Sequence, residues 1–190
     1  GINAEYGENM KTQLIFLIQI SGLCLLLALI WKLRKNPFIP RLSIIGPHNS
    51  GKTRLFFALR DQQTPVTVRS LQPNVFLGKL NGSRRSVEII DFPSDLALWP
   101  RWWRAKLMNS MVVLLVVNQL NVDDLQQFLE HKQFARFKRA FAVLYESGCE
   151  VHVKAVLAKL GFHPVKMIKG SLRREKWEVD ELDQFLGQHL

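Results

Sequence analysis

The sequence predicts an α/β domain, built on a mostly parallel sheet with helices on both faces and preceded by one transmembrane helix. Residues 14–31 are apolar and uncharged. From residue 41 onward, short apolar runs typical of buried strands alternate with segments of helical spacing. Early in this alternation, two strand-like runs flank Asn81-Gly82, which predicts a hairpin and one antiparallel edge strand.

The apolar run at residues 14–31 is interrupted only by Gln19, Ser21 and Gly22. A helix of this length spans about 27 Å, close to the hydrocarbon thickness of an endoplasmic reticulum bilayer. A core helix would carry a polar stripe, which this run lacks. A cleavable signal peptide would have a shorter apolar region and a small-residue cleavage site, and it remains the alternative to a retained anchor.

The flanking charges predict the orientation of this span. Before it, Lys11 is opposed by Glu5 and Glu8. Because positive flanks stay in the cytosol, residues 1–13 are predicted to be lumenal and the C-terminal domain cytosolic. The basic residues that follow the span are Lys32, Arg34, Lys35 and Arg41.

Residues 41–190 are expected to form one domain, joined to the span by a linker at residues 32–40 whose prolines end the helix. The unbroken apolar run at residues 111–117 is typical of a central parallel strand. The predicted strands cover residues 42–45, 75–80, 86–90, 111–117, 141–145 and 165–168. The predicted helices cover residues 52–59, 122–134, 151–160 and 179–190.

Composition narrows the class of protein. With 47% hydrophobic and 22% charged residues, wholesale disorder is excluded. Cys24 lies in the span and Cys149 in the domain, so neither a disulfide nor a cysteine metal site is expected. The net charge is +10, and many basic residues lie between Lys132 and Arg174. They form either a solvated face or a surface for anionic lipid or ribosomal RNA.

A complete Walker A motif follows the first predicted strand. The backbone N–H groups of such a loop surround phosphates, while its lysine, here Lys52, reaches the terminal phosphates and its threonine, Thr53, holds Mg²⁺. His48 occupies a variable position, so we assign it no catalytic role. The motif predicts phosphate binding by Gly46, Pro47, His48, Asn49, Ser50, Gly51, Lys52 and Thr53.

Asp91 is the second candidate, because it ends the second strand of the predicted hairpin. A lone Asp at a strand end is commonly a turn former. After a phosphate loop and a hairpin, however, it is predicted to hold Mg²⁺ through water, next to the ligand Thr53.

Together these motifs resemble the beta-subunit family of the signal recognition particle receptor, in the Arf and Ras branch of small GTPases. The resemblance rests on the span, the Walker A motif, residues 67–74 and residues 91–94. It implies GTP and Mg²⁺ as cofactors, and the receptor alpha subunit as partner. It also implies a single-pass location in the endoplasmic reticulum membrane near the ribosome or translocon, without sequence-specific nucleic-acid binding. The implied switch residues are Thr67, Ser70, Asp91 and Ser94.

Several positions depart from that family. Ser94 replaces the glycine whose backbone N–H contacts the γ-phosphate. Asp95 stands where a water-orienting residue is usual, and its charge would repel a γ-phosphate, so hydrolysis is expected to be very slow or absent. The Asn-Lys-x-Asp motif that reads guanine is missing, with its carboxylate absent or replaced by Glu150. Gly170 and Ser171 are weak candidates for base binding.

Three tryptophans, Trp99, Trp102 and Trp103, follow Asp91 closely. They form either the apolar face of the second-switch helix or, with Arg101 and Arg104, a surface for the partner.

The sequence therefore predicts a GTP-binding anchor subunit that recruits the receptor alpha subunit for co-translational protein targeting. Two alternatives stay open: another membrane-anchored P-loop NTPase, using ATP, and a degenerate nucleotide-binding scaffold without hydrolysis.

Overall fold

The computed structural model describes residues 2–35, 38–60, 71–80, 85–95, 99–130, 140–170 and 180–190. The chain divides into two compact units, Gly1–Phe38 and Ile39–Leu190. The division lies within the predicted linker of residues 32–40.

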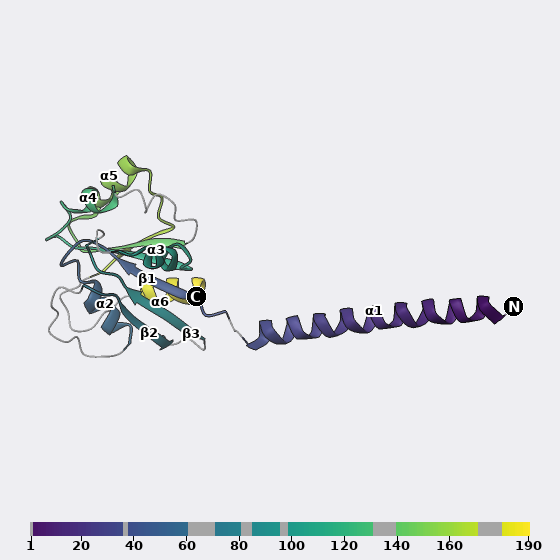
Figure 1. The fold of residues 1–190 in the computed structure, drawn as a ribbon. Coiled ribbons are helices and arrows are strands. Elements are labelled where there is room, and N and C mark those ends of the chain that lie inside the picture. Colours follow the sequence, from purple (N-terminus) through teal and green to yellow (C-terminus); the bar gives the residue numbers. More distant parts are fainter. Residues whose placement is uncertain are drawn as a thin grey trace. The chain divides into compact units, whose positions relative to one another are not determined.

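The first unit is a single long helix, α1 (Ile2–Lys35), of 34 residues (Figure 1). Its large apolar side chains between residues 16 and 31 are exposed, among them Phe16, Leu25 and Trp31. Within the described residues, however, no helix meets the length and apolarity expected of a membrane-crossing segment. The prediction of a helix at residues 14–31 is thus confirmed. The prediction that this helix crosses a membrane is not confirmed.

The second unit is built on a sheet whose described strands run in the order β2-β3-β1-β4-β5-β6. Among these strands, β2 and β3 pair antiparallel, and the other neighbours pair parallel. The prediction of a mostly parallel sheet with one antiparallel edge is confirmed. The strands are β1 (Arg41–Ile45), β2 (Asn74–Lys79), β3 (Ser86–Asp91), β4 (Val112–Val117), β5 (Ala140–Tyr145) and β6 (Lys166–Lys169).

Burial explains the different patterns of these strands. Every residue of β4 is buried, as expected for a central strand that is covered on both faces. The edge strand β2 instead alternates between half-buried and exposed residues, with Val75 and Leu77 on the exposed side.

Helices cover both faces of the sheet (Figure 1). Side chains such as Trp103, Phe128 and Val156, from α3, α4 and α5, pack with one face. Leu55 of α2 and Phe185 of α6 pack with the other. The helices are α2 (Lys52–Ala58), α3 (Arg101–Met108), α4 (Leu125–Leu129), α5 (Glu150–Leu160) and α6 (Asp180–His189).

One predicted helix is shorter than expected. In place of a helix from residue 122, residues 121–124 form turns and α4 begins at Leu125. The later part of that prediction, residues 131–139, lies outside the described residues, and so does the Asn81-Gly82 turn. The strands on either side of that turn nevertheless pair as predicted.

Candidate nucleotide-binding site

The phosphate loop joins β1 to α2 at the carboxyl edge of the sheet, and its backbone is tightly curled. Gly46 has a φ of 155°, and a Cβ at this position would lie 2.3 Å from the carbonyl oxygen of Val116 on β4. Gly51 has a φ of 93° and Asn49 one of 58°. The two glycines therefore allow a curl, and a close approach to β4, that residues with a Cβ would oppose.

Lys52 opens α2 and is only 6% exposed. Its Nζ donates hydrogen bonds to the carbonyl oxygen of Pro47 at 3.0 Å and to Oγ of Ser94 at 3.3 Å. Burial lowers the pKa of Lys52 to about 8, although the negative charge of Asp91 raises it. The ammonium group thus lies between the phosphate loop and the segment that follows β3, where poor access to water strengthens its attraction to an anion.

Asp91 ends β3 and accepts two hydrogen bonds on one oxygen. Oγ1 of Thr53 donates to Oδ2 at 2.8 Å, and Nδ2 of Asn74 donates to the same atom at 3.0 Å. Burial raises the pKa of Asp91, while the charge of Lys52 and the two hydrogen bonds oppose this shift. Asn74, the first residue of β2, is a functional candidate that the sequence analysis did not single out.

The arrangement of these groups fits Mg²⁺. Oδ1 of Asp91 and Oγ of Ser50 are buried and have no hydrogen-bond partner among the described residues. No group of three or more His, Cys, Asp or Glu side chains in the described residues could hold a metal by itself. A magnesium ion here would therefore rely on Thr53, Asp91, water and phosphate oxygens, a ligand set that is typical of nucleotide sites.

Two asparagines after β4 bind the backbone of the phosphate loop. Nδ2 of Asn118 donates to the carbonyl oxygen of Asn49 at 2.8 Å, and Nδ2 of Asn121 donates to that of His48 at 3.1 Å. The two are themselves joined, because the backbone N–H of Asn118 donates to Oδ1 of Asn121 at 3.1 Å. The sequence analysis did not identify this asparagine pair, Asn118 and Asn121, as functional. The available signal was a polar residue directly after a central parallel strand, where ligands of α/β proteins commonly bind.

The loop after β5, where guanine would be read, is bonded to the turn that follows β4. Oε2 of Glu146 accepts a hydrogen bond from the backbone N–H of Gln119 at 3.2 Å, and Nε2 of Gln119 donates to the carbonyl oxygen of Ser147 at 2.6 Å. A Cβ on Gly148 would lie 2.5 Å from that same Nε2. The side chain of Gln119 therefore packs directly on this loop.

Glu150 was one candidate to replace the carboxylate that reads guanine. Its Oε1 accepts a hydrogen bond from Nζ of Lys154 at 2.6 Å, within an i,i+4 ion pair on α5. The hydrogen bond from Lys154 lowers the pKa of Glu150 most, and a hydrogen bond from Tyr145 lowers it further. The carboxylate is therefore engaged on α5. Of the weak base-binding candidates, Gly170 bonds through its N–H to the carbonyl oxygen of Tyr145, and Ser171 lies outside the described residues.

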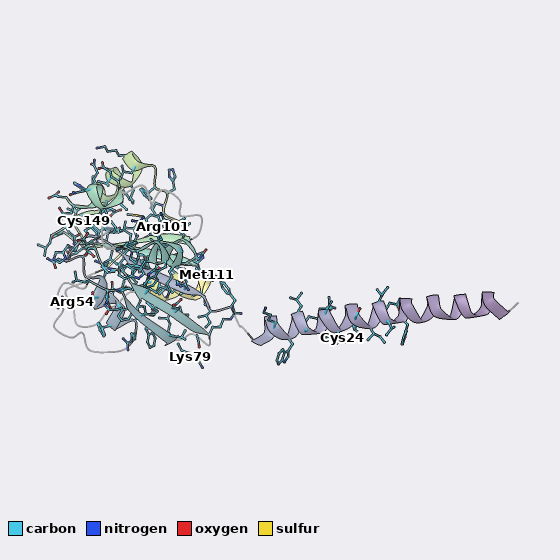
Figure 2. The ribbon with its side chains drawn as sticks, viewed as in Figure 1. Cys24, Arg54, Lys79, Arg101, Met111 and Cys149 are labelled. Atoms are coloured by element: carbon cyan, nitrogen blue, oxygen red, sulfur yellow. The ribbon has the colours of Figure 1, made fainter. Side chains whose placement is uncertain are left out.

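The tryptophans divide between core and surface. Trp99 is buried against Phe92 and donates from Nε1 to the carbonyl oxygen of Pro93 at 3.0 Å. Trp103 is 6% exposed and belongs to the core, whereas Trp102 is 56% exposed. Arg101, labelled in Figure 2 at the start of α3, is also exposed. Trp103 is therefore no candidate for direct contact with a partner, but Trp102 is.

The structure brings together Lys52, Thr53, Asp91 and Ser94, which the sequence placed in two separate motifs. Thr67 and Ser70, predicted for the first switch, lie outside the described residues. The roles of the phosphate-loop and switch residues in binding stay predictions.

Comparison with solved structures shows which fold this chain shares. A structure of the mammalian SRP receptor has a TM-score of 0.61 and 18% identity, and the match covers 79% of this chain and 100% of that chain. The Arl6 BBS3 small GTPase from Trypanosoma brucei, solved with a bound nucleotide analogue, GppNp, has a TM-score of 0.57 and 18% identity. That match covers 80% of this chain and 96% of that chain. At these identities the likeness concerns the fold, which is that of an Arf-like small GTPase.

A family model matches part of the chain. Residues 38–123, which include the phosphate loop, the β2–β3 pair and the first turns after β4, match the signal recognition particle receptor beta subunit family. The resemblance inferred from the motifs is thereby confirmed: residues 38–123 are similar to that family, and the fold is that of an Arf-like small GTPase. The search of curated proteins finds no match to this chain.

Proposed function

We propose that this chain binds a guanine nucleotide with Mg²⁺ and serves as the membrane-anchored subunit that recruits the receptor alpha subunit to the endoplasmic reticulum. The observation that carries the proposal is the contact between two sequence motifs at one edge of the sheet. Lys52 and Thr53 come from the phosphate loop, and Asp91 from the end of β3. This constellation is what a bound phosphate with Mg²⁺ requires.

Each group then has a defined part in binding. Backbone N–H groups of residues 46–53, Pro47 excepted, bind the phosphates, and the Lys52 ammonium neutralises part of their charge. Thr53 and Asp91 hold Mg²⁺, which supplies further neutralisation when it is bound. Asn74 keeps the Asp91 carboxylate oriented through its hydrogen bond to Oδ2. No residue is assigned a catalytic role.

Two features set limits on this activity. The contacts between Gln119 and the 146–148 loop occupy the region where guanine is usually read, which supports weak discrimination between bases. Asp95 adds negative charge directly after Ser94, which supports very slow hydrolysis. These features also favour the second candidate, a nucleotide-binding scaffold without hydrolysis.

The proposed partner and location rest on other observations. The family match and the likeness to a mammalian SRP receptor structure support association with the alpha subunit. The uncharged run at residues 14–31, contained within the single helix α1, supports anchoring in the membrane. Protease added outside intact microsomes should then digest the C-terminal domain, and full protection of that domain would contradict the orientation.

Nucleotide binding is tested with the full chain in mild detergent, titrated with fluorescent GTP, GDP and ATP in the presence of Mg²⁺. Lys52→Ala should weaken binding at least about tenfold, since a hydrogen bond to a charged group contributes roughly 1.5–3 kcal/mol. Lys79→Ala is the matched control, because it removes the same charge from an exposed position on β2. Equal affinities of parent and Lys52→Ala would remove the phosphate loop from the proposed function.

A further inference from the structure

The hydroxyl of Ser94 contacts the one phosphate-loop side chain whose usual partners are the terminal phosphates of a nucleotide. Nζ of Lys52 lies 3.3 Å from Oγ of Ser94 and 3.0 Å from the carbonyl oxygen of Pro47. Since Lys52 is 6% exposed, these protein oxygens replace much of the water that would surround an exposed ammonium. Oγ of Ser94 is thus one of the oxygens that solvate the Lys52 ammonium.

We propose that Ser94 makes this site discriminate against a third phosphate, so that its preferred ligand is a nucleoside diphosphate. This inference rests on the proposed nucleotide binding and names the ligand class of the same site. A diphosphate is expected to bind to the backbone N–H groups of the curled loop between Gly46 and Thr53. We expect it to leave the hydrogen bond between Lys52 and Ser94 in place.

A third phosphate has to enter between Lys52 and the segment after β3. There it must displace Oγ of Ser94 from the ammonium group and must also find space beside the Ser94 side chain, where a glycine would leave room. The hydrogen bond that is given up is part-buried and has a charged donor, so its loss offsets part of what the added phosphate gains from Lys52.

The charges in this segment act in the same direction. Asp95 is half-buried and follows Ser94 directly, and Asp91 ends the strand before them. A triphosphate carries more negative charge than a diphosphate, and it would place that added charge nearest to this pair of carboxylates. Mg²⁺ at Thr53 and Asp91 neutralises some of this charge, but it does so for both ligands.

The test compares GDP with the non-hydrolysable triphosphate GppNp by calorimetry, using the full chain in mild detergent with Mg²⁺. The parent should bind GDP at least about tenfold more tightly than GppNp. Ser94→Gly should raise the affinity for GppNp about tenfold, a factor that corresponds to roughly 1.4 kcal/mol, and leave that for GDP within about twofold.

Ser94→Ala separates the hydroxyl from the added freedom of a glycine, and should recover part of the GppNp affinity. Ser86→Ala is the matched control, an exposed serine at the opposite end of β3. Melting curves establish that each variant is folded.

The inference is overturned if the parent binds GppNp as tightly as GDP, or if both Ser94 variants leave the affinity ratio unchanged. It is also overturned if Ser94→Gly weakens GppNp binding, since the hydroxyl would then be a ligand of the third phosphate. Failure of the parent to bind either nucleotide would instead refute the proposed function, on which the inference depends.

Discussion

Replacing Asn121 by alanine tests whether the asparagine pair holds the phosphate loop in shape. Asn121 is 2% exposed, and its side chain takes part in two hydrogen bonds, one to the carbonyl oxygen of His48 and one from the backbone N–H of Asn118. Asn121→Ala removes both: the buried N–H of Asn118 loses its partner, whereas the carbonyl of His48, an exposed residue, can bind water instead. An unsatisfied buried N–H costs about 1–3 kcal/mol, so the free energy of unfolding should fall by that amount. Domains commonly have 5–15 kcal/mol in total, so the variant should remain folded.

The same change should weaken nucleotide binding about tenfold, because the loop loses a contact that holds its curled backbone. Asn49, with its φ of 58°, lies within that curl and gains its own hydrogen bond from Asn118. The assay is urea denaturation of the full chain in detergent, followed by titration with fluorescent GDP below the transition. Asn109→Ala, at an exposed position that ends α3, is the control.

Two outcomes distinguish the possible sources of the curl. If Asn121→Ala lowers both stability and affinity while Asn109→Ala changes neither, the pair shapes the loop from outside. A loss of stability with unchanged affinity would refute the reasoning and leave the conformation to the glycines of the motif.

Three further predictions concern Trp102, Trp103 and Lys52. Trp103→Ala should lower the free energy of unfolding by about 3–5 kcal/mol, because its side chain is buried in the core. Trp102→Ala should cost less than about 1 kcal/mol but weaken capture of the alpha subunit, and normal capture in a pull-down would exclude Trp102 from the interface. The pKa of Lys52 in the folded, nucleotide-free chain is about 8, below its ordinary value of 10.5, so the unfolded chain binds more protons between these values. Stability should therefore rise with pH across that window, relative to Lys52→Met, by up to about 1.4 kcal/mol per pH unit, and parallel pH profiles would contradict the buried ammonium.

The sequence by itself determined the main outline of the fold. The apolar run at residues 111–117 predicted the central strand. A strand that is covered on both faces has no side exposed to solvent, so polar residues do not alternate with apolar ones along it. The spacing of Gly46, Gly51, Lys52 and Thr53 predicted the phosphate loop, because that backbone path requires these residue types locally. Asp91 was also found from the sequence, since it directly follows a recognisable strand.

Only the tertiary structure decided how these local features meet. Trp102 and Trp103 are adjacent in the sequence, but one is exposed and the other is in the core. Which of the two is buried depends on which face of α3 packs on the sheet. Two neighbouring tryptophans in a sequence do not indicate that face. The helix expected from residue 122 begins only at Leu125, because residues 118–121 turn back to the phosphate loop.

The contacts that shape the site could not be predicted from the sequence, because they join segments that are far apart in the chain. Asn118 and Asn121 bond to backbone atoms 69 and 73 residues earlier in the chain, and Ser94 bonds to a lysine 42 residues before it. Local sequence patterns report the conformation of neighbouring residues, such as a strand, a helix or a tight turn. Contacts between distant segments depend instead on strand order, which places the carboxyl ends of β1, β3 and β4 side by side and so brings these side chains to one loop.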